Sequence, residues 1–327
     1  SCYVGSKVRK ITDSSELRRR RRLSKMVKTG MDWIEELDRA GLSPLRDEPL
    51  ALHVNFKIGG PADAFATAKN IEQAAAALRI ARAAGVPVFF LGRGSNLLVR
   101  DGGVRGLTLA LGGDFEKIEF PGPDLVHAGA AARVPRLVAS CARKGLSGLE
   151  PIVGVPGAVG GALVMNAGTP EGEIGPFVDE VETLDAQGRL RTLARADLRF
   201  GYRSSNLGES LVLSALLRLK PGVKGDIMAA LARRQRKRFL TQPIHTYNVG
   251  STFKNPPGLF AAKMIEQAGL KGRAVGGARV SPMHANFIEN FAGAKACDVL
   301  ALVDLISERV RAASGVKLEL EMRIVGE

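Results

Sequence analysis

The sequence predicts an α+β protein with two or three domains, and three observations lead to that prediction. The chain has 327 residues, of which 45% are hydrophobic, so it is long enough to bury a large core. Its 38 glycines and 5% aromatic residues are typical of nucleotide-binding enzymes, which have many tight turns and close backbone approaches. From about Leu50, predicted helices alternate with short apolar strands.

The first 30 residues carry more than half of the net charge. They contain ten Lys or Arg and two acidic residues, hence +8 of the formal +14. The run Arg18 to Arg22 repels itself and offers nothing to bury, so we expect residues 1–30 to be a disordered basic extension, and Met26 or Met31 is a candidate natural start. The remaining +6 suits a site for phosphorylated, anionic ligands.

The sequence lacks a secretory signal, a membrane-spanning segment and closely spaced cysteines. Residues 1–30 lack the apolar stretch of a secretory signal, and no run of about 18 apolar residues could span a membrane. We therefore expect a cytoplasmic protein without membrane insertion. The three cysteines, Cys2, Cys141 and Cys297, are far apart and lack Cys-x-x-Cys spacing, so we expect neither a structural disulfide nor a metal site.

The predicted elements follow from hydrophobic periodicity and turn residues. Helical periodicity begins at 32–37 and returns in the alanine-rich segment 71–84 and in 134–144. Strands are predicted at 86–91 and 211–219, a hairpin over 178–193 that turns at 186–189, and a closing strand at 316–325. Further helices are predicted at 226–240, 258–268 and 297–313.

We place a domain boundary near residue 220, where Pro221-Gly222 precedes the helix at 226–240. Residues 31–220 then form the first region, with two subdomains. Residues 221–327 form a C-terminal domain, and the last strand could return to the first region.

Two glycine-rich segments indicate a nucleotide site. Gly92 to Asn96 follows a predicted strand directly, and backbone amides freed at the end of a strand can cradle a pyrophosphate. The second segment runs from Val155 to Gly168. Neither matches Gly-x-Gly-x-x-Gly, because Leu97 stands where the third glycine belongs, so a Rossmann dehydrogenase is not favoured.

The turn Gly250 to Pro256 places a hydroxyl, a cation and an amide close together, in Ser251, Lys254 and Asn255. Ser251 is therefore a candidate proton donor. A hydroxyl is a weak acid, so neighbouring cations or an ordered water must assist it.

Five ordered segments carry a resemblance to a known family: 55–62, 92–96, 155–161, 200–203 and 250–256. From about residue 50 onwards the chain resembles the UDP-N-acetylenolpyruvoylglucosamine reductases of the shorter, second type. The resemblance implies an FAD-binding domain of the vanillyl-alcohol-oxidase (PCMH) type and a C-terminal α+β substrate-binding domain. It also implies non-covalent FAD, NADPH as hydride donor, and reduction of UDP-N-acetylglucosamine enolpyruvate to UDP-N-acetylmuramate for peptidoglycan.

The resemblance assigns catalytic roles to Arg203, Ser251 and Glu321. Hydride addition to an enolpyruvyl group moves electrons toward its carboxylate, so cations or acids must face that charge. Arg203 can bind the carboxylate as a fork, and burial would favour a protonated Glu321. Period-two alternation puts Glu319 and Glu321 on one face of the closing strand, and the family pattern selects Glu321.

Binding residues follow from the same motifs. The cofactor-binding residues implied are Asn55, Gly92, Gly94, Ser95, Asn96, Pro156, Gly157, Gly160, Gly161 and Asn166. The substrate-binding residues implied are Tyr202, Lys254, Asn255 and His284.

The chain departs from the family pattern at two places. Almost no insertion separates Asn255 from the next helix, so the tyrosine-bearing lid of the longer branch is absent. Members often have a basic residue directly before Gln242-Pro243, where this chain has Leu240-Thr241, which leaves Arg238 or Lys237 as substitutes.

Two other functions compete with the reductase. A sugar or alcohol oxidase of the same flavin fold is the nearer one, although such enzymes often attach flavin through His or Cys and neither glycine cluster contains either. A nucleic-acid-binding protein would use the basic extension and Arg233 to Arg238, but aromatic residues are not interleaved there. We expect a monomer that binds small molecules and no nucleic acid.

Overall fold

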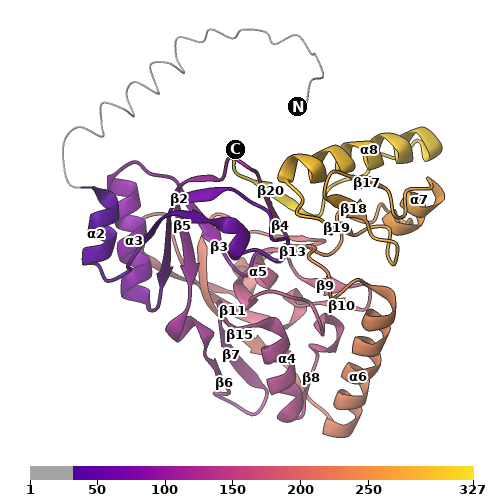
Figure 1. Ribbon diagram of the computed structural model, residues 1–327. Coiled ribbons are helices and arrows are strands. Elements are labelled where there is room, and N and C mark those ends of the chain that lie inside the picture. Colours follow the sequence, from indigo (N-terminus) through magenta and orange to yellow (C-terminus); the bar gives the residue numbers. More distant parts are fainter. Residues whose placement is uncertain (1–31) are drawn as a thin grey trace.

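The computed structural model describes residues 32–327, and its elements fall into three groups (Figure 1). The expectations for residues 1–30 lie outside the described residues. No helix in 32–327 is long and apolar enough to cross a membrane.

The first group is a four-stranded sheet covered by two helices. Its strands are β1 (Leu45–Pro49), β2 (Pro61–Ala68), β3 (Val88–Leu91) and β5 (Val104–Leu111), in the order β1-β2-β5-β3. The helices α2 (Trp33–Arg39) and α3 (Ile71–Ala83) accompany it, together with the 3₁₀ turn η1 (Leu50–Leu52). Asn70 caps α3, because its Oδ1 accepts a hydrogen bond from the Gln73 amide at 2.9 Å.

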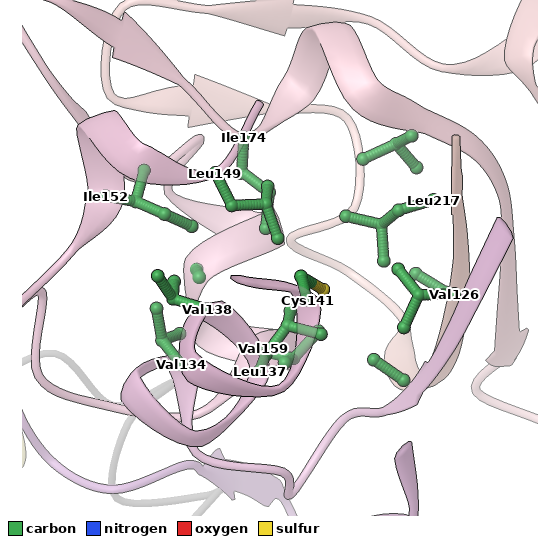
Figure 2. Close-up of a cluster of buried hydrophobic side chains, with 14 of the residues drawn as sticks. Val126, Val134, Leu137, Val138, Cys141, Leu149, Ile152, Val159, Ile174 and Leu217 are labelled. Carbon is green, nitrogen blue, oxygen red and sulfur yellow. The ribbon is translucent and has the colours of Figure 1, made fainter. Parts of the chain in front are cut away.

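The second group is a five-stranded antiparallel sheet with a helical layer. The sheet has the order β12-β11-β15-β7-β6, formed by β6 (Ile118–Glu119), β7 (Leu125–Gly129), β11 (Val178–Leu184), β12 (Leu190–Ala194) and β15 (Leu211–Arg218). The helices α4 (Val134–Arg143) and α5 (Val159–Val164) pack on it, and Figure 2 shows Val126 and Leu217 of the sheet facing the α4 and α5 side chains.

Short elements lie in the connections between the strands and helices of this group. They are the 3₁₀ turns η2 (Gly113–Glu116), η3 (Glu150–Ile152), η4 (Gly175–Phe177) and η5 (Arg195–Asp197), and the paired strands β8 (Leu146–Ser147) with β16 (Lys220–Pro221), β9 (Gly168–Thr169) with β10 (Gly172–Glu173), and β13 (Phe200–Gly201) with β14 (Ser204–Ser205).

The third group is the C-terminal unit. It contains α7 (Ala261–Gln267), α8 (Ala296–Ser314) and a small sheet of β17 (Ala274–Val275), β18 (Ala278–Val280) and β19 (Ile288–Asn290). The Asp101 carboxylate of the first group accepts hydrogen bonds from the Ala296 and Cys297 amides at 2.8 and 3.1 Å. This carboxylate therefore ties the start of α8 to the first group.

Helix α6 (Lys224–Thr241) packs with the second group, although the predicted division at residue 220 assigns it to the C-terminal domain. Its buried Ile227 and Leu231 belong to the core around α4 and β15, whereas the core of the C-terminal unit includes Val249 and the residues around α8.

The closing strand is much shorter than predicted. Only β20 (Arg323–Val325) is regular, and it pairs in parallel with β4 (Leu97–Val99) of the first group. Residues 316–322 instead make a single bridge, between Leu320 and Phe253. No regular strand carries Glu319 and Glu321, and their exposure differs: the Glu319 side chain is 74% exposed and that of Glu321 is 16% exposed.

Candidate active site

The two glycine-rich segments meet at one wall of the candidate site. Ser95 Oγ donates to the Pro156 carbonyl at 3.2 Å, and the Asn55 amide donates to the Gly94 carbonyl at 3.1 Å. The Ser95–Pro156 contact joins residues 61 positions apart in the chain. The first segment lies between β3 and β4, and the second precedes α5.

At three positions in this wall a side chain would collide with neighbouring atoms, each for a different local reason. Gly157 has φ +117°, and a Cβ there would lie 2.6 Å from Ser95 Oγ. Gly94 has φ +60°, and its Cβ would meet the Val54 backbone at 2.6 Å. Gly160 packs against Ala130, with 3.0 Å between the two Cβ positions. Glycine is therefore required at these positions, because the backbone segments approach one another too closely for a side chain.

Gly92 and Gly161 differ, because a Cβ on either would meet no other atom within 4 Å. Bare backbone here faces open space beside the Ser95–Pro156 contact. Such a wall allows a flat or phosphorylated group to approach the backbone closely, so these residues fit a flavin dinucleotide.

Arg203 and Glu321 form the polar centre of the site. Arg203 Nε donates to Glu321 Oε1 at 2.6 Å and Arg203 Nη2 donates to the Gly168 carbonyl at 3.0 Å. The Arg203 side chain is 14% exposed. Arg203 is the second residue of the tight β13–β14 turn and has φ +54°, an uncommon backbone conformation for a non-glycine residue. Residues in such conformations cluster at functional sites.

Burial raises the pKa of Glu321, and the charge of Arg203 and then of Lys254 opposes that rise. The carboxyl group therefore retains its proton to a higher pH than an ordinary glutamate does. The buried carboxyl and the guanidinium could both face an anionic group.

Ser251 is half-buried and its backbone neighbours are held by Glu321 and Asn286. The Thr252 carbonyl accepts a hydrogen bond from the Glu321 amide at 2.9 Å. The buried Asn286 amide group binds both the Phe253 amide (3.0 Å) and the Phe253 carbonyl (2.8 Å). Ser251 therefore precedes a fixed segment next to the acid.

The first glycine segment reaches this centre directly. Asn96 Nδ2 donates to the Glu321 carbonyl at 3.0 Å, so this predicted cofactor residue holds the backbone of the predicted catalytic acid. The structure thus brings together four of the five motif segments: those containing Asn55, Ser95, Pro156 and Ser251. Arg203 adds the fifth through Glu321.

Substrate candidates lie around the same centre. Tyr202 Oη accepts a hydrogen bond from the Asn255 amide at 3.4 Å, and the Arg203 guanidinium lies 5.0 Å from the Tyr202 ring centre. Lys254 Nζ lies 3.4 Å from Glu319 Oε2. Asn255 Oδ1 accepts from the Ala261 amide at 3.0 Å, so this side chain also starts α7.

Two predicted residues have mainly internal partners. Asn166 is 1% exposed, and its amide group binds Glu173, the Gly201 carbonyl and the Gly175 amide. It thereby holds the hairpin that carries Arg203. His284 stacks edge-on against Phe287, with ring centres 4.7 Å apart, and burial lowers its pKa.

Sequence reasoning missed Asn286. It lies in the same Ser281 to Phe287 run as His284, but nothing in the sequence showed that this amide would pair with the Phe253 backbone. The pairing joins positions 33 apart and depends on the fold of the C-terminal unit.

Comparisons with known proteins give one family for most of the chain. The model of the UDP-N-acetylenolpyruvoylglucosamine reductase C-terminal domain matches residues 242–325, and the model of an FAD binding domain matches residues 62–194. The chain is similar to UDP-N-acetylenolpyruvoylglucosamine reductase 2 of Symbiobacterium thermophilum, at 42% identity over 86% of this chain and 92% of the relative.

Further relatives give the same result. The reductase of Agathobacter rectalis is 42% identical over 90% of this chain and 96% of its own length. Among solved structures, UDP-N-acetylenolpyruvylglucosamine reductase from Thermus caldophilus matches with a TM-score of 0.75 and 37% identity, over 87% of this chain and 99% of that chain.

Proposed function

The chain belongs to the UDP-N-acetylenolpyruvoylglucosamine reductase family, and on that premise we propose that Arg203, Glu321 and Ser251 carry out its chemistry. The protein is an FAD-dependent oxidoreductase that reduces UDP-N-acetylenolpyruvoylglucosamine with NADPH in peptidoglycan biosynthesis. The α+β fold expected from the sequence, with an FAD-binding domain followed by a reductase C-terminal domain, is confirmed.

The Arg203–Glu321 pair is the observation that supports the residue roles best. When bound, FAD supplies the hydride that adds to the enolpyruvyl double bond. Arg203 then binds the substrate carboxylate, toward which negative charge moves, and a protonated Glu321 donates a hydrogen bond to the same group. Arg203 Nε lies 2.6 Å from Glu321 Oε1, so one substrate carboxylate can contact both side chains.

Ser251 donates the proton that completes the reduction. The backbone that follows Ser251 is fixed by Asn286 and by the Glu321 amide, which keeps this segment beside the acid. The charge of Lys254 lowers the pKa of Glu321, and a cation that also reaches the Ser251 hydroxyl would favour the alkoxide left when the proton is donated.

The remaining assignments extend the same proposal. Gly92, Gly94, Ser95, Pro156, Gly157, Gly160 and Gly161 form the wall for FAD, and Asn55, Asn96 and Asn166 hold that wall and the residues beside it. Tyr202, Lys254, Asn255 and His284 contact the substrate. We propose a cytoplasmic monomer, and light scattering during size-exclusion chromatography tests the monomer.

Anaerobic absorbance spectroscopy tests the function. NADPH is expected to bleach the flavin bands, and UDP-N-acetylglucosamine enolpyruvate is expected to restore them. Bleaching without restoration would mean that another acceptor is the substrate. A Ser251→Ala variant should still bleach but should be restored far more slowly, and equal restoration would contradict the role of Ser251.

A further inference from the structure

The Glu173 carboxylate binds a buried amide that leads toward Arg203. Glu173 ends β10 and is half-buried, and its Oε2 accepts a hydrogen bond from Asn166 Nδ2 at 2.5 Å. The other acid of this hairpin, Glu171, instead pairs with the α6 cations Arg234 and Lys237. The two carboxylates of the hairpin therefore have different kinds of partner.

Glu173 determines which way the Asn166 amide points. An ionised carboxylate only accepts hydrogen bonds, so it must face the Nδ2 end of that amide. The same Nδ2 donates to the Gly201 carbonyl at 3.0 Å, and Asn166 Oδ1 accepts from the Gly175 amide at 3.0 Å. Turning the amide around would place its oxygen against a carboxylate and a carbonyl. Asn166 is 1% exposed, so water could not relieve that repulsion.

The Gly201 carbonyl lies at the start of the turn that carries Arg203. Gly201 pairs with Ser204, so Tyr202 and Arg203 are the two residues at the tip of this turn. Arg203 has φ +54°, a conformation that a non-glycine residue keeps only when its surroundings hold it there. The bond from Asn166 to Gly201 supplies one such restraint.

The guanidinium of Arg203 also depends on the strand that contains Glu173. Arg203 Nη2 donates to the Gly168 carbonyl at 3.0 Å, and Gly168 pairs with Glu173 between β9 and β10. These two residues are in close contact, because a Cβ on Gly168 would lie 2.6 Å from Glu173 Cγ. Glu173 thus supports the Arg203 backbone through Asn166 and the Arg203 side chain through Gly168.

We propose that Glu173 is a positioning residue that keeps the Arg203 guanidinium aimed at Glu321 and at the substrate carboxylate. It acts through the orientation of Asn166 and through its pairing with Gly168. The inference rests on the proposed role of Arg203. A group displaced by about 1 Å from its productive position costs about 10²-fold in rate, so loss of this support has a measurable effect.

The length and the charge of the Glu173 side chain can be tested separately, by following reoxidation of the NADPH-reduced, FAD-loaded enzyme by its substrate. Glu173→Gln keeps the length and an oxygen that accepts the Asn166 bond, so reoxidation should stay close to the wild-type rate. Glu173→Asp keeps the charge but is one methylene shorter and withdraws from Asn166, so reoxidation should be about 10- to 100-fold slower, as in Glu173→Ala.

The matched control is Glu182→Ala. It removes another half-buried carboxylate that accepts a short hydrogen bond, from Ser214 Oγ at 2.6 Å, but within the sheet of the second group. Reoxidation should keep the wild-type rate in this variant.

Two further measurements distinguish positioning from a general loss of structure. UDP-N-acetylmuramate retains the carboxylate that Arg203 is proposed to bind, so in calorimetric titration Glu173→Asp should bind it about tenfold more weakly than Glu173→Gln does. Arg203 and Lys254 are the charges that act on Glu321, and a displaced guanidinium opposes the raised pKa of Glu321 less. The alkaline fall in the reoxidation rate should therefore move to higher pH in Glu173→Asp.

Fast reoxidation in Glu173→Asp together with slow reoxidation in Glu173→Gln would overturn the proposal, because charge and not length would then matter. Wild-type behaviour of all three Glu173 variants, or an equal loss in Glu182→Ala, would overturn it as well. If Glu173→Ala does not fold, Glu173→Gln and Glu173→Asp alone decide. Arg203→Gln is measured in parallel. Slow reoxidation there with wild-type Glu173 variants refutes only this inference, whereas wild-type reoxidation there refutes the proposed role of Arg203 itself.

Discussion

Replacing Glu321 by glutamine tests the centre of the site most directly. The substitution keeps the volume and a hydrogen-bond donor but removes the ionisable proton. The ion pair that it removes joins Arg203 Nε to Glu321 Oε1 at 2.6 Å, and these two side chains are only 14% and 16% exposed. Water therefore does little to replace what is lost.

The size of the effect follows from the role proposed. A donor aimed at charge that develops in the transition state contributes about 10²–10³ in kcat, or about 2.7–4 kcal/mol. Glu321→Ala should lose that amount in the step that consumes the substrate, and Glu321→Gln should lose less because it keeps a donor. Reduction by NADPH should be unchanged in both variants.

The pH dependence distinguishes an acid from a merely structural carboxyl. The protonated form of Glu321 is the active one, so kcat should fall as pH rises through its raised pKa. Arg203 opposes that rise, so Arg203→Gln should move the fall in kcat to still higher pH. Glu321→Gln should lack this fall.

Single-turnover reoxidation of the NADPH-reduced enzyme, followed by flavin absorbance from pH 5 to 9, measures both effects. An alkaline fall of kcat that persists unchanged in Glu321→Gln would refute the assignment. A fall that moves to lower pH in Arg203→Gln would refute the electrostatic reasoning.

Three further predictions follow from single contacts. Ser251→Ala should slow reoxidation by about 10²- to 10⁴-fold, as loss of a proton donor does, with unchanged reduction by NADPH in stopped-flow traces. Gly157→Ala should lower the FAD content of the purified protein, because its Cβ would lie 2.6 Å from Ser95 Oγ at φ +117°, whereas Gly208→Ala, which meets open space, should retain full flavin absorbance. Asn286→Ala should lower the free energy of unfolding by about 1–3 kcal/mol in urea titration, because it leaves the Phe253 amide and carbonyl unpaired, and unchanged stability would contradict the role of this side chain.

The local elements could be predicted because their signals are local. The alanine-rich helix expected at 71–84 is α3 at Ile71–Ala83, and the hairpin expected over 178–193 is β11 and β12. In both cases periodicity and turn residues within about 15 positions determine the structure.

The short length of the closing strand could not be predicted, because the segments with which it pairs are distant in the sequence. Alternation over 316–325 predicted one strand, but Leu320 bridges to Phe253 and Arg323 pairs with Leu97, so the segment serves two neighbours in turn.

The motifs named the residues of the candidate site but not the contacts that hold them in place. Arg203, Ser251 and Glu321 follow from motifs, and the structure places Arg203 against Glu321. The supporting contacts of Asn286 and Asn96 join distant segments, and no local pattern carries that information. The different surroundings of Lys237 and Arg238 also depend on the fold, because Lys237 lies near Glu171 whereas Arg238 donates to the Val153 carbonyl.

The bond between Asn96 and Glu321 joins residues 225 positions apart, and it is followed directly by the β4–β20 pairing. On the ribosome, the first glycine-rich segment therefore emerges long before its partner exists. Contacts of such sequence separation form late and slowly. The Ser95–Pro156 contact of the cofactor wall can form before β20 is synthesised, whereas the Asn96–Glu321 contact cannot, so we expect a chain terminated upstream of β20 to retain flavin less well than the full chain.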